Sequence, residues 1–105
     1  MSLTSDLIRG HTDTIILARL LEGDSYGYQI NKEIMDKTGG AFELKEATLY
    51  TVFRRLEQSG MIRSYWGEGM GARRRYYAIT PLGRALYQQN REEWEKTKKI
   101  IDGLM

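Results

Sequence analysis

The sequence predicts a mainly α-helical domain that carries one small β-hairpin. Apolar residues recur at helical spacing over most of the 105 residues. Two runs with strand-like alternation, 62–66 and 75–79, directly follow one of the expected helices. Thr80 and Pro81 then form a typical helix start, because a proline in the first turn loses no hydrogen bond. The length suits one compact unit, with a first part at 1–80 and a final helix at 81–105.

The helix before the hairpin is predicted by Leu49, Val52, Phe53 and Leu56, which fall at i, i+3, i+4 and i+7. The rest of its circumference carries hydroxyls, an amide and guanidinium groups, which can donate to phosphates or read base edges. These residues are Thr48, Tyr50, Thr51, Arg54, Arg55 and Gln58. In an isolated helix, an ordinary solvated face is the better interpretation of the two arginines. Because a hairpin follows this helix directly, DNA contact becomes the better interpretation of both arginines.

The hairpin is predicted to be basic. The segment 67–73 holds three glycines, so we expect a flexible loop that can lie close to a phosphate backbone. It leads into Arg73, Arg74 and Arg75, of which at most alternate members share a strand face. We expect at least one of Arg73 and Arg75 to contact phosphate. Arg74 is also a DNA-binding candidate, with a structural role, such as pairing with a carboxylate, as the alternative. A helix followed by a basic hairpin is the layout of a DNA-binding winged helix-turn-helix.

Two helices are expected ahead of this unit. The first should run from Thr4 or Ser5 to about Leu21, and the second should start after Ser25 as its N-cap and end at Gly39-Gly40. The second should turn Ile30, Ile34 and Met35 inward.

Two features near the second helix bear on DNA contact. Tyr26 opens this helix, and its hydroxyl is a candidate for phosphate contact, with ring packing as the alternative. The segment 41–44 should be extended and add a minor strand to the hairpin.

The last helix should carry a seam for a second copy of the chain. Its residues are spaced by three and four, as in the a and d positions of a coiled coil. The seam comprises Tyr87, Asn90, Trp94, Thr97, Ile101 and Leu104. A terminal helix on so small a domain has little core of its own to bury against, so we expect a homodimer held by this seam and the N-terminal helix.

Composition limits the possible functions. The chain is 41% hydrophobic and 29% charged, with no run long enough to span a bilayer and no signal-peptide pattern. We therefore expect a cytoplasmic protein without a membrane partner. Cysteine is absent and His11 is the one histidine, which leaves no common zinc site and no readable catalytic set. We expect neither an enzyme nor a metal or cofactor.

Several short motifs together resemble the PadR family of transcriptional regulators over essentially the whole chain. They are Tyr26-Gly27-Tyr28-Gln29-Ile30, Glu46-Ala47-Thr48-Leu49-Tyr50, Arg55-Leu56-Glu57, Gly60-Met61-Ile62, Arg73-Arg74-Arg75-Tyr76-Tyr77 and Ile79-Thr80-Pro81-Leu82-Gly83. The resemblance implies a winged helix with a C-terminal dimerisation helix. It also implies binding to pseudo-palindromic operators in double-stranded DNA, and repression that a small-molecule effector relieves.

The single short C-terminal helix resembles a compact subfamily that includes multidrug-responsive repressors. In such a relative, a tryptophan of this helix stacks on planar drugs at the dimer centre, and Trp94 matches its position. We expect a site for a planar aromatic effector made by Trp94, Lys98 and Asn90; the alternative is that Trp94 only anchors the interface. Lys98 replaces a carboxylate of the multidrug-binding relative, so a preference for cationic drugs does not transfer. Lys45 replaces a small polar N-cap and is a candidate for direct phosphate contact.

Two other function classes compete with a dimeric DNA-binding repressor. A winged helix can serve as a protein-interaction module, which predicts weak and salt-insensitive association with DNA. The arginine run at 73–75 argues against this reading. A small enzyme is the third class, and the lack of an acid/base or nucleophile set argues against it.

Overall fold

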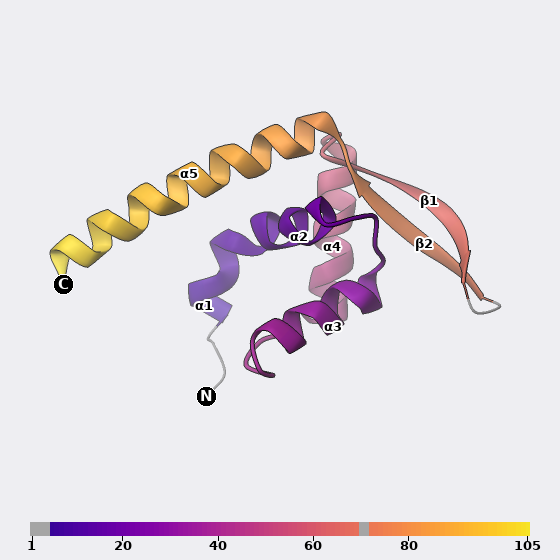
Figure 1. The fold of residues 1–105 in the computed structure, drawn as a ribbon, viewed down its shortest axis with the longest axis horizontal. Helices are drawn as coiled ribbons and strands as arrows, with labels where there is room; N and C mark the ends of the chain where they lie inside the picture. The colour runs from indigo at the N-terminus through magenta and orange to yellow at the C-terminus, as the bar shows by residue number, and fades with distance from the viewer. Residues whose placement is uncertain (1–4, 70–71) are drawn as a thin grey trace.

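The computed structural model describes residues 5–69 and 72–105. In chain order the elements are α1 (Ser5–Ile8), the 3-10 turn η1 (Arg9–His11), α2 (Thr12–Leu21), α3 (Gly27–Lys37), α4 (Glu46–Gln58), β1 (Ile62–Gly69), β2 (Ala72–Ile79) and α5 (Pro81–Leu104). Helices α2, α3 and α4 make the body, while the hairpin and α5 project from it at opposite ends (Figure 1). The predicted class, mainly α-helical with one hairpin in a winged helix-turn-helix, is confirmed.

One hydrophobic core joins the three body helices to the base of the hairpin. The predicted stripe of α4 is entirely buried. Phe53 of this stripe stacks on Tyr77 of β2, with ring centroids 3.9 Å apart. The largest fully buried side chains of the core are Phe53, Ile16, Leu17, Leu20, Ile30, Leu49 and Ile62. This core fixes the hairpin, called the wing from here on, against the C-terminal half of α4.

The wing is longer than the sequence predicted. Its strands are antiparallel and pair from Ile62 with Ile79 out to Gly69 with Ala72. The expected glycine-rich loop at 67–73 was therefore wrong at both ends, because Gly67 pairs with Arg74 inside the ladder. A Cβ atom on Gly67 would lie 2.6 Å from the ring of Tyr76, so the glycine lets this ring lie across the strand. Residues 70 and 71, in the middle of the expected loop, lie outside the described residues.

The first expected helix is interrupted. Residues 9–11 form a tighter 3-10 turn between α1 and α2, and the alternative start at Thr4 lies outside the described residues. Gly10 within this turn is a poor helix former, and the hydroxyl of Thr12 donates to the carbonyl of Arg9 at 3.4 Å. The turn changes the chain direction, so Leu7 remains 68% exposed instead of joining the core.

Ser25 does not cap the second helix, contrary to expectation. Its backbone N–H donates to the Tyr77 carbonyl at 3.1 Å, and the Tyr77 N–H donates back at 2.7 Å. This bridge commits Ser25 to β2, so α3 begins at Gly27 with Tyr26 as its N-cap. The Ser25 hydroxyl is buried and has no hydrogen-bond partner among the described residues.

Two further expectations around α3 were wrong. Met35 is exposed, because Ile30 and Ile34 alone fill the inward face of the helix. The segment 41–44 adds no strand, and the described sheet consists of β1 and β2. Asn31 holds this segment instead, since its amide donates to the Leu44 carbonyl at 2.8 Å and accepts from the Leu44 N–H at 2.9 Å.

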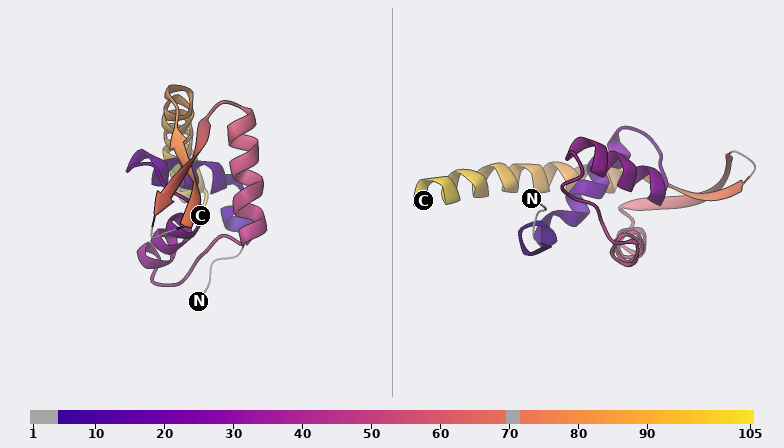
Figure 2. Two further views of the ribbon diagram at one scale, coloured as in Figure 1. Left: turned by 90° about the vertical axis from the view of Figure 1, so that its right-hand side faces the viewer. Right: turned by 90° about the horizontal axis from the view of Figure 1, so that it is seen from below.

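Helix α5 begins as the sequence predicted. Thr80 is its N-cap and accepts from the Gly83 N–H at 3.1 Å, with Pro81 in the first turn. The first half of α5 packs along α2, and the second half extends beyond the body (Figures 1 and 2). This projection contributes to the elongated shape of 52 × 32 × 21 Å. In the described part of the chain, no helix has the length and apolar character needed to cross a membrane.

The start of α5 packs so closely that Gly83 tolerates no side chain. A Cβ atom there would lie 2.0 Å from the Met61 carbonyl oxygen and 2.9 Å from Ile79. We expect Gly83→Ala to lower the free energy of unfolding by about 1–3 kcal/mol, the usual cost of overpacking, as measured by urea denaturation. Gly103→Ala is the matched control, because nothing lies within 4 Å of the corresponding Cβ position. Equal stability of the two variants would contradict this packing.

Candidate nucleic-acid interface and effector site

Helix α4 presents a polar face to solvent. Thr48, Tyr50, Thr51 and Arg54 are all exposed on it, and no described hydrogen bond or ion pair engages Arg54. Lys45 is also exposed at the N-cap of α4, where its side chain makes no capping hydrogen bond. The start of α4 therefore keeps its free amide groups, and a cation stands beside them. Such a face can approach an anion without first breaking internal contacts.

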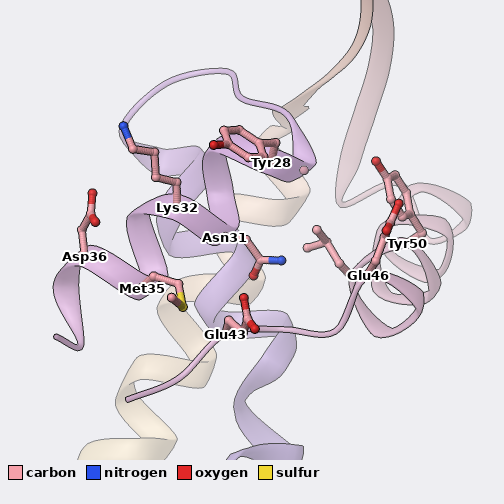
Figure 3. Close-up of a pocket in the computed structure, with 10 residues that line it drawn as sticks. Tyr28, Asn31, Lys32, Met35, Asp36, Glu43, Glu46 and Tyr50 are labelled. Carbon is pink, nitrogen blue, oxygen red and sulfur yellow. The ribbon is translucent and has the colours of Figure 1, made fainter. Parts of the chain in front are cut away.

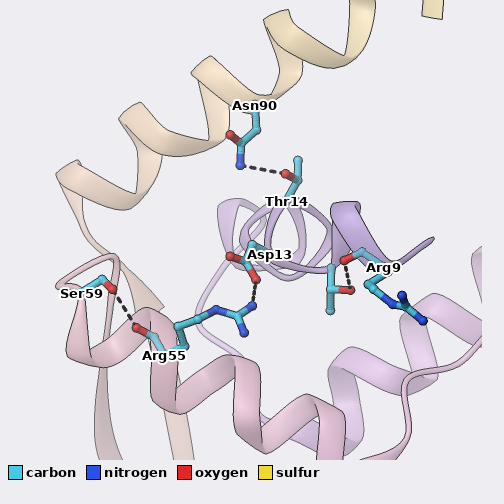
Figure 4. A network of polar contacts seen from close by, with 7 residues as sticks. Arg9, Asp13, Thr14, Arg55, Ser59 and Asn90 are labelled. Carbon is cyan, nitrogen blue, oxygen red and sulfur yellow. Dashed lines mark hydrogen bonds and ion pairs between the residues drawn. The ribbon is translucent and has the colours of Figure 1, made fainter. Parts of the chain in front are cut away.

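Arg55 is engaged on the other side of α4. Its guanidinium donates to the carboxylate of Asp13 at the start of α2, so it ties the two helices together (Figure 4). The sequence predicts a DNA contact for Arg55 from its polar helix face and the basic hairpin that follows. Because it already has a partner within the protein, Arg55 is a weaker candidate than Arg54.

The three wing arginines have three different environments. Arg74 donates to the Tyr26 hydroxyl at 3.1 Å, and its guanidinium lies 4.6 Å from the centre of the Tyr26 ring. Arg75 donates to the Ser64 hydroxyl at 2.8 Å and lies 3.7 Å from the Glu57 carboxylate. Arg73 lies over the ring of Trp66 at 4.9 Å. The expected structural role of Arg74 fits this contact, but its partner is a phenol, and Arg75 is the arginine beside a carboxylate.

Tyr26 has a packing role. Its ring meets Tyr76 edge-on at 5.4 Å, and its hydroxyl accepts from Arg74. Of the two roles considered for Tyr26, the structure therefore supports packing. Its neighbour Tyr28 is 75% exposed and is free to meet a ligand.

Two hollows flank the start of α3, and they differ in charge. The hollow between α3 and α4, of about 490 Å³, has Lys32 against three carboxylates, those of Asp36, Glu43 and Glu46 (Figure 3). The second hollow, of about 460 Å³, opens between α3, α4 and the wing and is called the basic hollow here. No carboxylate is among the described residues that line it. Its side chains are Tyr26, Tyr28, Tyr50, Trp66, Arg73, Arg74 and Arg75.

Electrostatics therefore favours a polyanion at the basic hollow and disfavours one at the hollow of Figure 3. Burial raises the pKa of Tyr77, and the hydrogen bond that Tyr65 donates to Asp24 raises the pKa of Tyr65. Neither of these two phenols is therefore ionised around pH 7, and neither offsets the positive charge of the wing.

Trp94 lies half-buried on α5 and touches its own protomer. His11 of η1 meets the indole edge-on, with centroids 4.7 Å apart, and the Lys98 ammonium lies 5.8 Å from the ring centre. Lys98 also donates to Glu95 at 3.3 Å, and this hydrogen bond holds the pKa of that carboxyl below its ordinary value. Lys98 is therefore near Trp94, as expected, but its charge is partly neutralised.

The expected seam divides into two parts. Tyr87 packs on the core of its own protomer, and Asn90 donates to the Thr14 hydroxyl of α2 at 3.0 Å (Figure 4). The expectation that α5 has little of its own protomer to bury against was wrong for the first half of the seam, because α2 lies beneath it. Thr97, Ile101 and Leu104 are exposed. The apolar surface available to a partner thus begins beyond Trp94.

His11 and Asp13 are the site residues that sequence reasoning missed. Both lie near the start of α2, where the chain meets α5 through His11 and α4 through Asp13. These contacts join residues far apart in the sequence, and nothing in the local spacing marks them. Trp66 was assigned only to a strand, although pairing the ends of the two predicted strands would have placed it opposite Arg75.

Comparison with known proteins gives consistent matches. The model of the family described as "Transcriptional regulator PadR-like family" matches residues 16–89. A transcriptional regulator from Clostridium thermocellum of known structure is 57% identical. It has a TM-score of 0.88 and covers 93% of this chain and 96% of its own.

Two further proteins support this match. A PadR family transcription regulator from Clostridium difficile is 31% identical, with a TM-score of 0.80, over 90% of this chain and 97% of its own. "Uncharacterized protein X" of Lysinibacillus sphaericus is 50% identical over 102 residues, which are 96% of this chain and 94% of that protein. The matched family and the two solved structures are transcriptional regulators, not enzymes.

Proposed function

Because the chain belongs to the PadR-like family of transcriptional regulators, whose members bind DNA, we propose that it is a dimeric repressor that releases its operator when a planar aromatic effector binds. A regulator of this kind acts where the chromosome is, so we expect the protein in the cytoplasm.

The observation that carries the DNA part of this proposal is the basic hollow beside the exposed face of α4. In our proposal α4 enters the major groove, where Tyr50, Thr51 and Arg54 meet base edges. Lys45 and Thr48 meet the backbone near the start of the helix. The wing lies on the flanking phosphates through Arg73 and Arg75, while Arg74 holds Tyr26 in place.

The dimer part rests on the exposed apolar end of α5. Ile100 is 63% exposed, Ile101 43% and Leu104 81%, on a helix that has left its own body. A second copy of this helix would cover them. The pair would present two α4 helices, which must lie about 34–36 Å apart to enter successive major grooves.

The effector part rests on Trp94. In the proposed dimer, the two-fold axis brings Trp94 near its symmetry mate. A planar aromatic molecule between them gains stacking and apolar burial, on the order of several kcal/mol. The angle between the subunits, and with it the spacing of the α4 helices, would then change. In this proposal Asn90 stabilises the site without contacting the effector, because its amide already donates to the Thr14 hydroxyl.

The DNA part is tested by measuring duplex affinity at increasing salt. The logarithm of affinity should fall linearly with the logarithm of salt concentration, with a slope of about −0.9 for each phosphate contacted. Selection from a random duplex pool should then enrich a pseudo-palindromic sequence. Weak, salt-insensitive association would favour the protein-interaction module instead. In vitro transcription from a promoter with the selected site distinguishes repression from activation.

We predict that flat polycyclic dyes quench Trp94 in a Trp66→Phe background, where Trp94 is the one remaining tryptophan. Trp94→Ala should weaken dye binding about tenfold or more, because the stacking surface is lost. The signal is the fluorescence of Trp94 during dye titration, and the dye's own fluorescence anisotropy gives the affinity of Trp94→Ala, which has no tryptophan in this background. Lys98→Gln is the matched control, since it keeps the indole and tests the ammonium alone. Equal dye affinity of Trp94→Ala and wild type would place the site elsewhere.

A further inference from the structure

Trp66 is a large aromatic residue that the wing leaves open. It lies on β1 and is 55% exposed, whereas Phe53 and Tyr77 in the core at the base of the wing are 1% and 4% exposed. An exposed indole lacks the stabilisation that burial of its large apolar surface would give. Tryptophan is also enriched where a protein meets a partner. The neighbours of Trp66 indicate what that partner is.

The strand register places Trp66 among cations. Trp66 pairs with Arg75, and Glu68 pairs with Arg73 one step further out, so these four side chains share one face of the wing. The guanidinium carbons of Arg73 and Arg75 lie 4.9 and 5.5 Å from the centre of the indole. Both arginines are thus held by the same ring.

This face is continuous with the one that meets α4. Nearer the body it carries Tyr77, which stacks on Phe53, and Ser64, which donates to Glu57 of α4. Beyond these contacts the face opens into the basic hollow, where Trp66 lies with Tyr28 and Tyr50. The indole is therefore on the side of the wing that turns toward the recognition helix.

We infer that Trp66 is itself a DNA-contacting residue of the wing. The exposed part of its ring packs on the sugars of the strand that Arg73 and Arg75 hold through their phosphates. Sugar faces and aromatic rings bury apolar area together, and the contact is independent of base sequence. The cation–π contacts show that the ring lies directly beside both guanidinium groups, so it can follow the same strand. This inference goes beyond the proposed function and rests on its DNA part.

The test uses Trp94→Phe, which leaves Trp66 as the one tryptophan. The probe is a mixed-sequence DNA duplex at low salt, because sugar and phosphate contacts need no operator. At saturating duplex, acrylamide quenching of Trp66 should fall by about half or more, since the partner covers the exposed ring. As the control, a reporter made by Tyr65→Trp in a Trp66→Phe/Trp94→Phe background lies on the opposite wing face and should stay accessible.

Duplex affinity distinguishes a direct contact of Trp66 with DNA from a role in which Trp66 only positions the two arginines. Trp66→Ala should weaken duplex binding about tenfold and leave the salt slope unchanged, because the phosphate contacts remain. Trp66→Phe should retain affinity within about threefold, since an aromatic ring still covers the sugar. A flattened slope in Trp66→Ala, or unchanged acrylamide quenching in the complex, would overturn the inference while DNA binding stands. If wild type binds no duplex, the proposed function fails first and this inference fails with it.

Discussion

The double variant Arg73→Ala/Arg75→Ala should bind every DNA duplex far more weakly than wild type at 0.1 M salt, by roughly 50-fold for each wing that lies on DNA. Each phosphate contact releases counterions that contribute about 0.9 logarithmic units at this concentration, and two such contacts are lost per wing. The slope of log affinity against log salt should flatten by about 1.8 per wing, or about 3.6 for a dimer with both wings bound, for the same reason. Fluorescence anisotropy of a labelled duplex at several salt concentrations measures both quantities. The loss should be the same for operator and random DNA, because phosphates carry no sequence information.

The matched control removes two arginines far from the wing. Arg84 and Arg91 lie exposed on α5, so Arg84→Ala/Arg91→Ala makes the same change in net charge. Its salt slope should equal that of wild type. A double wing variant with an unchanged slope would remove the wing from the interface, whatever its affinity.

Ile101→Lys should convert a dimer into monomers at micromolar concentration, as measured by sedimentation velocity. The substituted ammonium and its symmetry copy would be brought together in an apolar contact, and burying unpaired charges is strongly unfavourable. The monomer would carry one recognition helix instead of two, so specific operator affinity should fall far more than affinity for random DNA. Its far-ultraviolet circular dichroism should stay that of wild type, because Ile101 is outside the core.

Gly103→Lys is the control for this substitution. It adds the same charge two residues further along α5, which is roughly 200° around a helix and therefore on the face away from Ile101. No heavy atom lies within 4 Å of its Cβ position. Gly103→Lys should remain dimeric. Sedimentation of the wild-type protein as a monomer at the same concentration would show that the dimer proposal is wrong.

The contacts at the start of α2 give the proposed effector site at Trp94 a physical connection to α4. His11 touches Trp94, Thr14 accepts from Asn90, and Asp13 between them holds Arg55 of α4. A dye that displaces Trp94 would therefore act on residues 11–14, which are also bonded to α4 through Asp13 and Arg55. The Trp94 titration described above can be repeated with bound duplex to measure this coupling.

Local patterns in the sequence were sufficient for the elements that depend on neighbours along the chain. The spacing of Leu49, Val52, Phe53 and Leu56 predicted the buried face of α4 because helical period alone decides which side chains share a face. Thr80 and Pro81 predicted the start of α5 for a similar reason, since a capping hydrogen bond spans three residues. The arginine run predicted where positive charge gathers.

Only the tertiary structure decided the partners that come from distant segments. Ser25 reads as a helix cap in the sequence, but Tyr77 of β2 takes its backbone hydrogen bonds. Arg55 and Arg54 are indistinguishable in the sequence, and Asp13, 42 residues from Arg55, separates them. Asn90 looks available until Thr14, 76 residues away, is placed beside it. Such pairings depend on how the helices pack in three dimensions, and the local spacing that identifies each helix contains no information about which residue of another helix will face it.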